Sequence, residues 1–132
     1  MKITADTNVL VRAITGDDAR QARIARNTLE HADAVVLATP TLCELVWVLA
    51  QGYDAGAAEI GVAVRRLIAA ANVVVNRPAA EAGLALLEAG GDFADGVIAY
   101  EGRRLGADMF VSFDKKAVKL LEKSGEAAHL LI

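Results

Sequence analysis

The sequence predicts one α/β domain, residues 1–132, built around a mostly parallel sheet of about five short strands. Short apolar runs alternate with segments of helical periodicity along the chain, the pattern of strand, helix, strand units with parallel strands. An apolar fraction of 55% in 132 residues suffices for one well-buried core. With only two prolines and no serine- or glycine-rich tract, no linker to a second domain is expected.

Five runs are expected to form strands, because each is apolar or alternating and is bounded by polar or turn residues. In the first, apolar residues alternate with Lys2 and Thr4 until the polar trio Asp6, Thr7, Asn8 leads into a loop or helix. The second is apolar throughout, typical of a strand buried on both faces. The five runs lie at residues 2–5, 34–38, 73–75, 109–113 and 128–132.

Six helices are expected from their start signals and apolar spacing. Thr39 followed by Pro40 indicates an N-cap and a proline at the first helical position. Aspartates are the expected caps of three other helices. The helices run from Asp17 or Asp18 to about Glu30, from Thr39 to about Tyr53, from Asp54 to about Ala71, from Pro78 to about Gly90, from Asp92 to Gly106 and from Lys115 to Lys123.

The helix that begins at Thr39 is apolar almost all round, so it must be covered on both sides. In so small a domain the second cover is expected from another chain, which makes Trp47 and Val48 candidate interface residues. Glu44 shares their face and needs a partner. A glutamate stabilised by the dipole of a helix N-terminus is the alternative explanation of Glu44.

Composition and motifs exclude several functions. The net charge of −3 argues against a protein that coats nucleic acid, although it leaves room for a nuclease that carries its positive charge in metal ions. No P-loop or GxGxxG motif is present, and Cys43 lies in an apolar helix where a core thiol is expected. No apolar run approaches the roughly 18 residues of a membrane span. With a lone cysteine, the chain is expected to be cytoplasmic.

Four carboxylates are expected to meet at one edge of the sheet, because the carboxyl ends of parallel strands share an edge. Asp6 and Asp114 follow strands, while Glu44 and Asp95 begin helices at the same edge. Carboxylates packed together must take up protons or bind cations. Oxygen ligands favour Mg²⁺ or Mn²⁺ over Zn²⁺, and His31 and His129 are expected far from this edge. Simple helix capping is the alternative for Asp6, Asp95 and above all Asp92.

Four segments carry a resemblance to a known family: DTNVLVR, TPTLCELVWVL, DFADGVIAYEGRRLGAD and VSFDKKA. Together they resemble a PIN domain, and most closely the VapC-type toxins of type II toxin-antitoxin systems. The resemblance implies a three-layer α/β/α sandwich in which Asp6, Glu44, Asp95 and Asp114 are the catalytic, metal-binding acids. Asp92 is implied as an auxiliary ligand. Asn8 and Ser112 match polar positions that orient an acid or a metal-bound water.

The activity that the resemblance implies is that of an endoribonuclease with one or two Mg²⁺ or Mn²⁺ ions. Such a chain would form a homodimer and be inhibited by a VapB-type antitoxin that covers Trp47 and Val48. Arg12, Lys115 and Lys116 start at the acidic edge and are the candidate RNA-binding residues. Arg103 and Arg104 lie roughly 12–14 Å from Asp95 along their helix, too far to serve the site.

Two other functions remain open from the sequence. A haloacid-dehalogenase-like phosphatase also begins with a strand that ends in aspartate, but its motif requires a second aspartate where this chain has Asn8. A non-catalytic PIN-like module that binds proteins is the other alternative. The presence of all four acids argues against it. Metal binding at the acidic edge would distinguish the enzyme from such a module, because capping alone predicts none.

Overall fold

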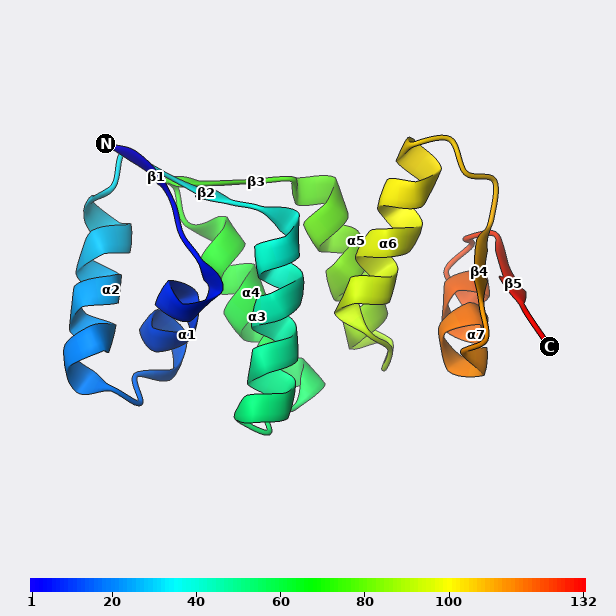
Figure 1. Cartoon of the computed structure of the whole chain (residues 1–132), viewed down its shortest axis with the longest axis horizontal. Coiled ribbons are helices and arrows are strands. Elements are labelled where there is room, and N and C mark those ends of the chain that lie inside the picture. The colour runs from blue at the N-terminus through cyan, green and yellow to red at the C-terminus, as the bar shows by residue number, and fades with distance from the viewer. The chain divides into compact units, whose positions relative to one another are not determined.

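The structure, a computed structural model, describes residues 1–132 and contains seven helices and five strands. The chain divides into two compact units, residues 1–77 and residues 78–132 (Figure 1). Every strand pairs in parallel, so the predicted α/β class with a parallel arrangement is confirmed. None of the seven helices has the length and apolar character that a membrane span requires.

The first unit contains a parallel sheet with the strand order β1-β2-β3, in which Val35 lies opposite Ile3 on one side and Val73 on the other. Helix α1 packs against α2 and α3, and α3 packs against α4. The elements are β1 (Lys2–Thr4), α1 (Thr7–Thr15), α2 (Ala19–His31), β2 (Ala34–Leu37), α3 (Thr39–Gly52), α4 (Ala57–Ala69) and β3 (Val73–Val75).

Strand β2 shows how the core of this unit is built. Val35 and Leu37 are buried, whereas Val36 between them is 42% exposed and its neighbour in β3, Val74, is 52% exposed. Successive side chains of a strand point to opposite faces, so only one face of this sheet is well covered. The expectation of a strand buried on both faces is therefore wrong. The buried side is completed by helix residues, among them Leu10, Leu42, Leu45, Ile60 and Val64.

Several helix starts differ from the sequence expectation. Asp18, and not Asp17, caps α2, with its carboxylate accepting the Gln21 N–H at 3.0 Å. Helix α3 already includes Thr39, so its N-cap is Ala38, which makes no side-chain capping bond.

Asp54 does not cap α4. The N-cap is Gly56, and Asp54 adopts a left-handed φ of 53°, which aspartate tolerates better than most residues. The segment after Asp6, expected as loop or helix, is the helix α1.

The second unit holds a parallel pair of strands, with Phe110 opposite Ala128. Strands β1, β2 and β3 thus pair within the first unit, and β4 and β5 pair within the second. A cluster of Leu86, Ala99 and Leu121, with Phe110 packed against it, forms an apolar core. The elements are α5 (Arg77–Glu88), which begins at the last residue of the first unit, then α6 (Phe93–Arg104), β4 (Phe110–Ser112), α7 (Lys115–Lys123) and β5 (Ala128–Leu130).

Helices α5 and α6 touch through glycines. A Cβ atom on Gly96 would lie 2.4 Å from the backbone oxygen of Ala82, and one on Gly83 would lie 2.7 Å from the buried ring of Phe93. Neither position has room for a larger residue while the helices keep their places. This contact fixes the first turn of α6, where Asp92 and Asp95 lie.

Candidate functional site

The five acids named from the sequence divide between the two units. Asp6 and Glu44 belong to the first unit. Asp92, Asp95 and Asp114 belong to the second. Each of the two groups has its own local geometry.

Asp6 and Glu44 lie at the start of neighbouring helices. Asp6 follows β1 and caps α1, with Oδ1 accepting the Val9 N–H at 3.1 Å. The hydroxyl of Thr7 donates to Oε1 of Glu44 on α3, which fixes that carboxylate beside the start of α1. Sequence reasoning missed Thr7. Its signal was a hydroxyl placed between two polar candidates, Asp6 and Asn8.

A groove with a volume of about 360 Å³ runs between α1 and α3. Its lining starts at Asp6, Thr7 and Glu44 and continues to Arg12 and Tyr53. The two helices run in the same direction along it, since Thr7 meets Glu44 near their starts and Arg12 meets Tyr53 near their ends. The carboxylates of Asp6 and Glu44 therefore lie at one end of an open groove that has both polar and apolar lining residues.

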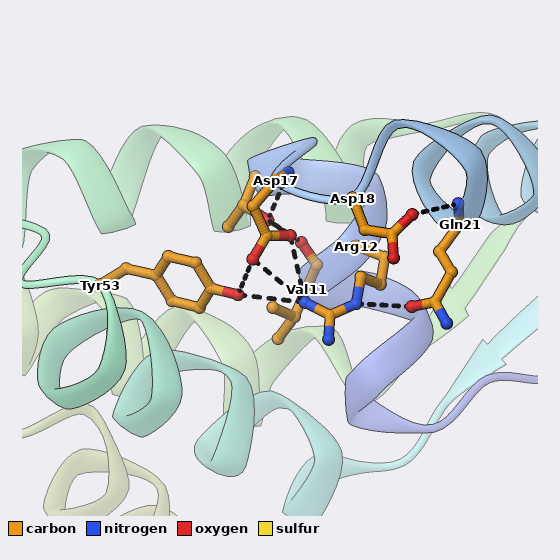
Figure 2. Close-up of polar contacts among 7 residues, drawn as sticks. Val11, Arg12, Asp17, Asp18, Gln21 and Tyr53 are labelled. Atoms are coloured by element: carbon orange, nitrogen blue, oxygen red, sulfur yellow. Dashed lines mark hydrogen bonds and ion pairs between the residues drawn. The ribbon is translucent and has the colours of Figure 1, made fainter.

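Arg12 is held in a network at the far end of this groove (Figure 2). Its Nε donates to Gln21 Oε1 at 2.7 Å, and its Nη1 lies 3.1 and 3.2 Å from the two carboxylate oxygens of Asp17. The same Nη1 lies 3.2 Å from the Tyr53 hydroxyl, which donates to Asp17 Oδ2 at 2.6 Å. The expected RNA-binding arginine thus already has an ion-pair partner.

The charges in this network stabilise each other. The negative charge of Asp17 raises the pKa of Arg12 above its usual value. Hydrogen bonds from Tyr53 and Thr15, together with the Arg12 charge, lower the pKa of Asp17. Both groups therefore stay ionised at neutral pH, and their charges largely offset one another.

In the second unit, Asp92 and Asp114 cap helices. Asp92 accepts the Ala94 N–H at 2.9 Å at the start of α6, as the capping alternative predicts. Asp114 accepts the Ala117 N–H at 3.1 Å at the start of α7. The hydroxyl oxygen of Ser112 accepts the backbone N–H of Asp114 at 2.9 Å and so fixes the turn that presents this acid.

Asp95 lies in the first turn of α6 and is half-buried. Burial raises its pKa, and the negative charges of Asp92 and Asp114 raise it further. Asp92 and Asp114 thus each repel the carboxylate of Asp95, and a bound cation would relieve this repulsion.

A comparison with protein families matches the PIN domain over residues 3–123. The chain belongs to the PIN domain family. A search of curated proteins found no match to this sequence. PIN domains are generally metal-dependent nucleases, so the family supports binding to nucleic acid and the use of divalent metal ions.

The candidate acids of this PIN domain have the ligand chemistry that a divalent metal ion requires. The candidate acids supply carboxylate oxygens, with hydroxyl groups of Thr7 and Ser112 beside two of them, and no Cys or His takes part. Hard oxygen donors of this kind favour Mg²⁺ or Mn²⁺. No three His, Cys, Asp or Glu side chains lie close enough together in the structure to hold a metal ion as they stand.

The basic candidates of the PIN domain differ in their surroundings. Lys115 and Lys116 form the exposed first turn of α7, directly after Asp114. Arg103 pairs with Glu126 at 2.6 Å near the other end of α6 from Asp95. The candidate interface residue Trp47 is 65% exposed on α3.

Proposed function

We propose that this PIN domain is a Mg²⁺- or Mn²⁺-dependent endoribonuclease and the VapC-type toxin of a toxin-antitoxin system. The observation that carries the proposal is that Asp95 is half-buried at the start of α6 in a chain of this nuclease family, where burial and then the negative charges of Asp92 and Asp114 raise its pKa. A carboxylate with a perturbed pKa beside other charged groups is typical of functional sites.

In this proposal Asp6, Glu44, Asp95 and Asp114 bind one or two metal ions, with Asp92 as an auxiliary ligand. The metal would activate water and stabilise the charge that develops on the phosphodiester. Thr7 holds Glu44, and Ser112 holds the turn of Asp114, so both acids are oriented before substrate arrives. Asn8, which lines the groove beside Asp6, supplies a further polar group there.

The experiment is a cleavage assay on a labelled structured RNA with Mg²⁺, with Mn²⁺ and with EDTA. We expect cleavage only with metal. Asp6→Asn should lower the rate by at least about 100-fold, because loss of a metal removes several kcal/mol of transition-state stabilisation. Asp108→Asn, at an exposed acid outside the cluster, is the matched control and should cleave at the wild-type rate. Wild-type cleavage by Asp6→Asn would show that this residue is no ligand.

Lys115 and Lys116 are proposed to contact RNA phosphates near the metal. Phosphate contacts depend on salt, so Lys116→Ala should raise the RNA dissociation constant and reduce the salt slope by about 0.7. Arg104→Ala, at the far end of α6, serves as the control. The reverse result would place the RNA on another face of the second unit.

The proposed partners are a second copy of the chain and a VapB-type antitoxin that packs over Trp47 and Val48. The antitoxin would direct an arginine to the acids, because a guanidinium pairs well with carboxylates and competes with metal for them. Trp47 is the one aromatic residue of α3 and is exposed, as an anchor for a partner should be. Trp47→Ala should weaken antitoxin binding at least about tenfold, while Val62→Ala on α4 should not. Unchanged affinity of the Trp47 variant would reject this location.

A further inference from the structure

We propose that the groove between α1 and α3 is a subsite for one nucleotide of the RNA, next to the phosphate that is cut. Its recognition groups are the ring of Tyr53 and the guanidinium of Arg12. The inference rests on the proposed function, because it takes the Asp6 and Glu44 end of the groove as the place of the scissile phosphate. It assigns a role to Tyr53, Asp17 and Gln21.

The dimensions of the groove suit a nucleotide beside the acids. Five residues separate Thr7 from Arg12 along α1, a rise of roughly 8 Å at 1.5 Å per residue. Its volume of about 360 Å³ lies in the range of small-ligand sites, which is roughly 300–1,000 Å³. Groups at the far end therefore reach the neighbouring nucleotide and not the scissile phosphate itself.

Arg12 is oriented for recognition before any ligand binds. Gln21 holds its Nε, and Asp17 and Tyr53 hold its Nη1. The dashed lines of Figure 2 reach Nε and Nη1 of Arg12, and its third nitrogen, Nη2, has two further N–H donors. The side chain is 27% exposed and Arg12 is among the residues that line the groove. In the proposed subsite the two Nη2 donors meet the nucleotide. Because Asp17 offsets the charge, these donors supply directed hydrogen bonds more than net attraction.

Tyr53 supplies a fixed aromatic face. The residue is 37% exposed and follows the last turn of α3 at the C-cap. Its hydroxyl is held by Asp17, and the ring points toward Arg12 and Asp17 in Figure 2. Proteins that bind unpaired RNA stack its bases on such rings. A fixed ring beside an oriented guanidinium is suited to a base and its phosphate.

A purely structural role is the alternative to recognition. The network joins the end of α3 to α1, to the segment before α2 and to α2 itself. A bracing role predicts that substitutions change stability and leave nucleotide binding alone. A recognition role predicts that RNA binding changes in variants that stay folded. The change should differ between variants that remove the Tyr53 ring, the Arg12 guanidinium or the Asp17 charge.

The first measurement is an amide and Arg Nε–H NMR titration of the metal-free protein with adenosine 5′-monophosphate. We expect the largest shifts at Tyr53, Asn8 and the Arg12 Nε–H. Inorganic phosphate, as the second probe, should shift Arg12 but not Tyr53. Equal shifts with both probes would show an anion site without base recognition and would contradict the nucleotide subsite.

The second measurement is the affinity for a labelled single-stranded RNA of mixed sequence. Tyr53→Ala should weaken binding by about fivefold or more, since stacking is lost, and Tyr53→Phe should weaken it less because the ring remains. Arg12→Lys keeps the charge but loses the fork, so it should also weaken binding. Asp17→Asn releases the full Arg12 charge and should steepen the salt dependence by about 0.7 in slope. Arg66→Ala, at an exposed arginine of α4, is the control.

Circular dichroism melts show which variants are folded. If Tyr53→Ala does not fold, the RNA affinity of Tyr53→Phe is compared with that of wild type instead. Wild-type affinity of folded Tyr53 and Arg12 variants would overturn the subsite, even if Asp6→Asn abolishes cleavage. A wild-type chain that cleaves no RNA would instead contradict the proposed function. Nucleotide shifts at Tyr53 would support the subsite in that case too.

Discussion

Replacing Asp95 by asparagine should abolish metal-dependent RNA cleavage and also raise the melting temperature of the metal-free protein. The carboxylate is a proposed ligand, so the rate should fall by at least about 100-fold. The same carboxylate is half-buried and repelled by Asp92 and Asp114, which raises its pKa. Its ionised form therefore destabilises the fold until a cation binds, and asparagine removes that cost. The expected gain is about 1–3 °C.

The sign of the stability effect can be checked by pH. Because folding raises the pKa of Asp95, the cost is absent below its unfolded-state pKa of about 3.9, where the group is protonated in both states. It grows as the pH rises through the raised folded-state pKa. The Asp95→Asn variant should thus melt higher than wild type at pH 7 and equally at acid pH.

Metal ions should reverse the order of the melting temperatures of wild type and Asp95→Asn, so that wild type melts higher. A ligand that binds only the folded state stabilises it, so Mg²⁺ or Mn²⁺ should raise the melting temperature of wild type more than that of Asp95→Asn. Glu101→Gln, an exposed acid on the same helix, is the control and should respond to metal as wild type does. Loss of activity together with an unchanged response to metal would mean that Asp95 acts without binding the ion.

Replacing Gly96 by alanine should destabilise the second unit strongly. The added Cβ would lie 2.4 Å from the Ala82 backbone oxygen, which cannot move without shifting α5. Overpacking of this kind costs about 1–3 kcal/mol or more, and it outweighs the gain of about 0.5–1 kcal/mol from alanine in a helix. We expect the melting temperature to fall by about 5 °C or more. Activity should fall with it, because the contact holds the turn of Asp92 and Asp95.

Gly102 provides a matched control on the same helix. A Cβ there would lie 4.0 Å from Ala107 Cβ, an ordinary contact, so Gly102→Ala should be neutral or stabilising. Thermal melts of Gly96→Ala and Gly102→Ala show whether the close approach of α5 and α6 or the helix propensity of alanine controls the stability. If both alanines raised stability alike, the α5 and α6 contact would not be the constraint that we describe.

Local signals in the sequence were sufficient for most elements and for the acidic candidates. The cap at Asp92 was predicted because an N-cap bonds within three residues of itself, whereas the cap at Asp114 was not foreseen. Helix α7 agrees with the predicted span of about Lys115 to Lys123. The start of α4 was missed because Asp54 has the local sequence signal of a helix cap, as good as that of Gly56. In the structure Asp54 adopts a left-handed φ and the N-cap of α4 is Gly56.

The sequence by itself determined the α/β class and the alternation of strands and helices, since periodicity and capping act over a few residues, and it named the acids that are candidates for the site. Only the tertiary structure decided how the strands pair within each unit and that Thr7 holds Glu44. It also decided that Arg12 is paired with Asp17 and Tyr53. Thr7 lies 37 residues from Glu44, and Arg12 lies 41 from Tyr53, so no local pattern links them. Such contacts arise only when packing brings two helices together and fixes their side-chain rotamers.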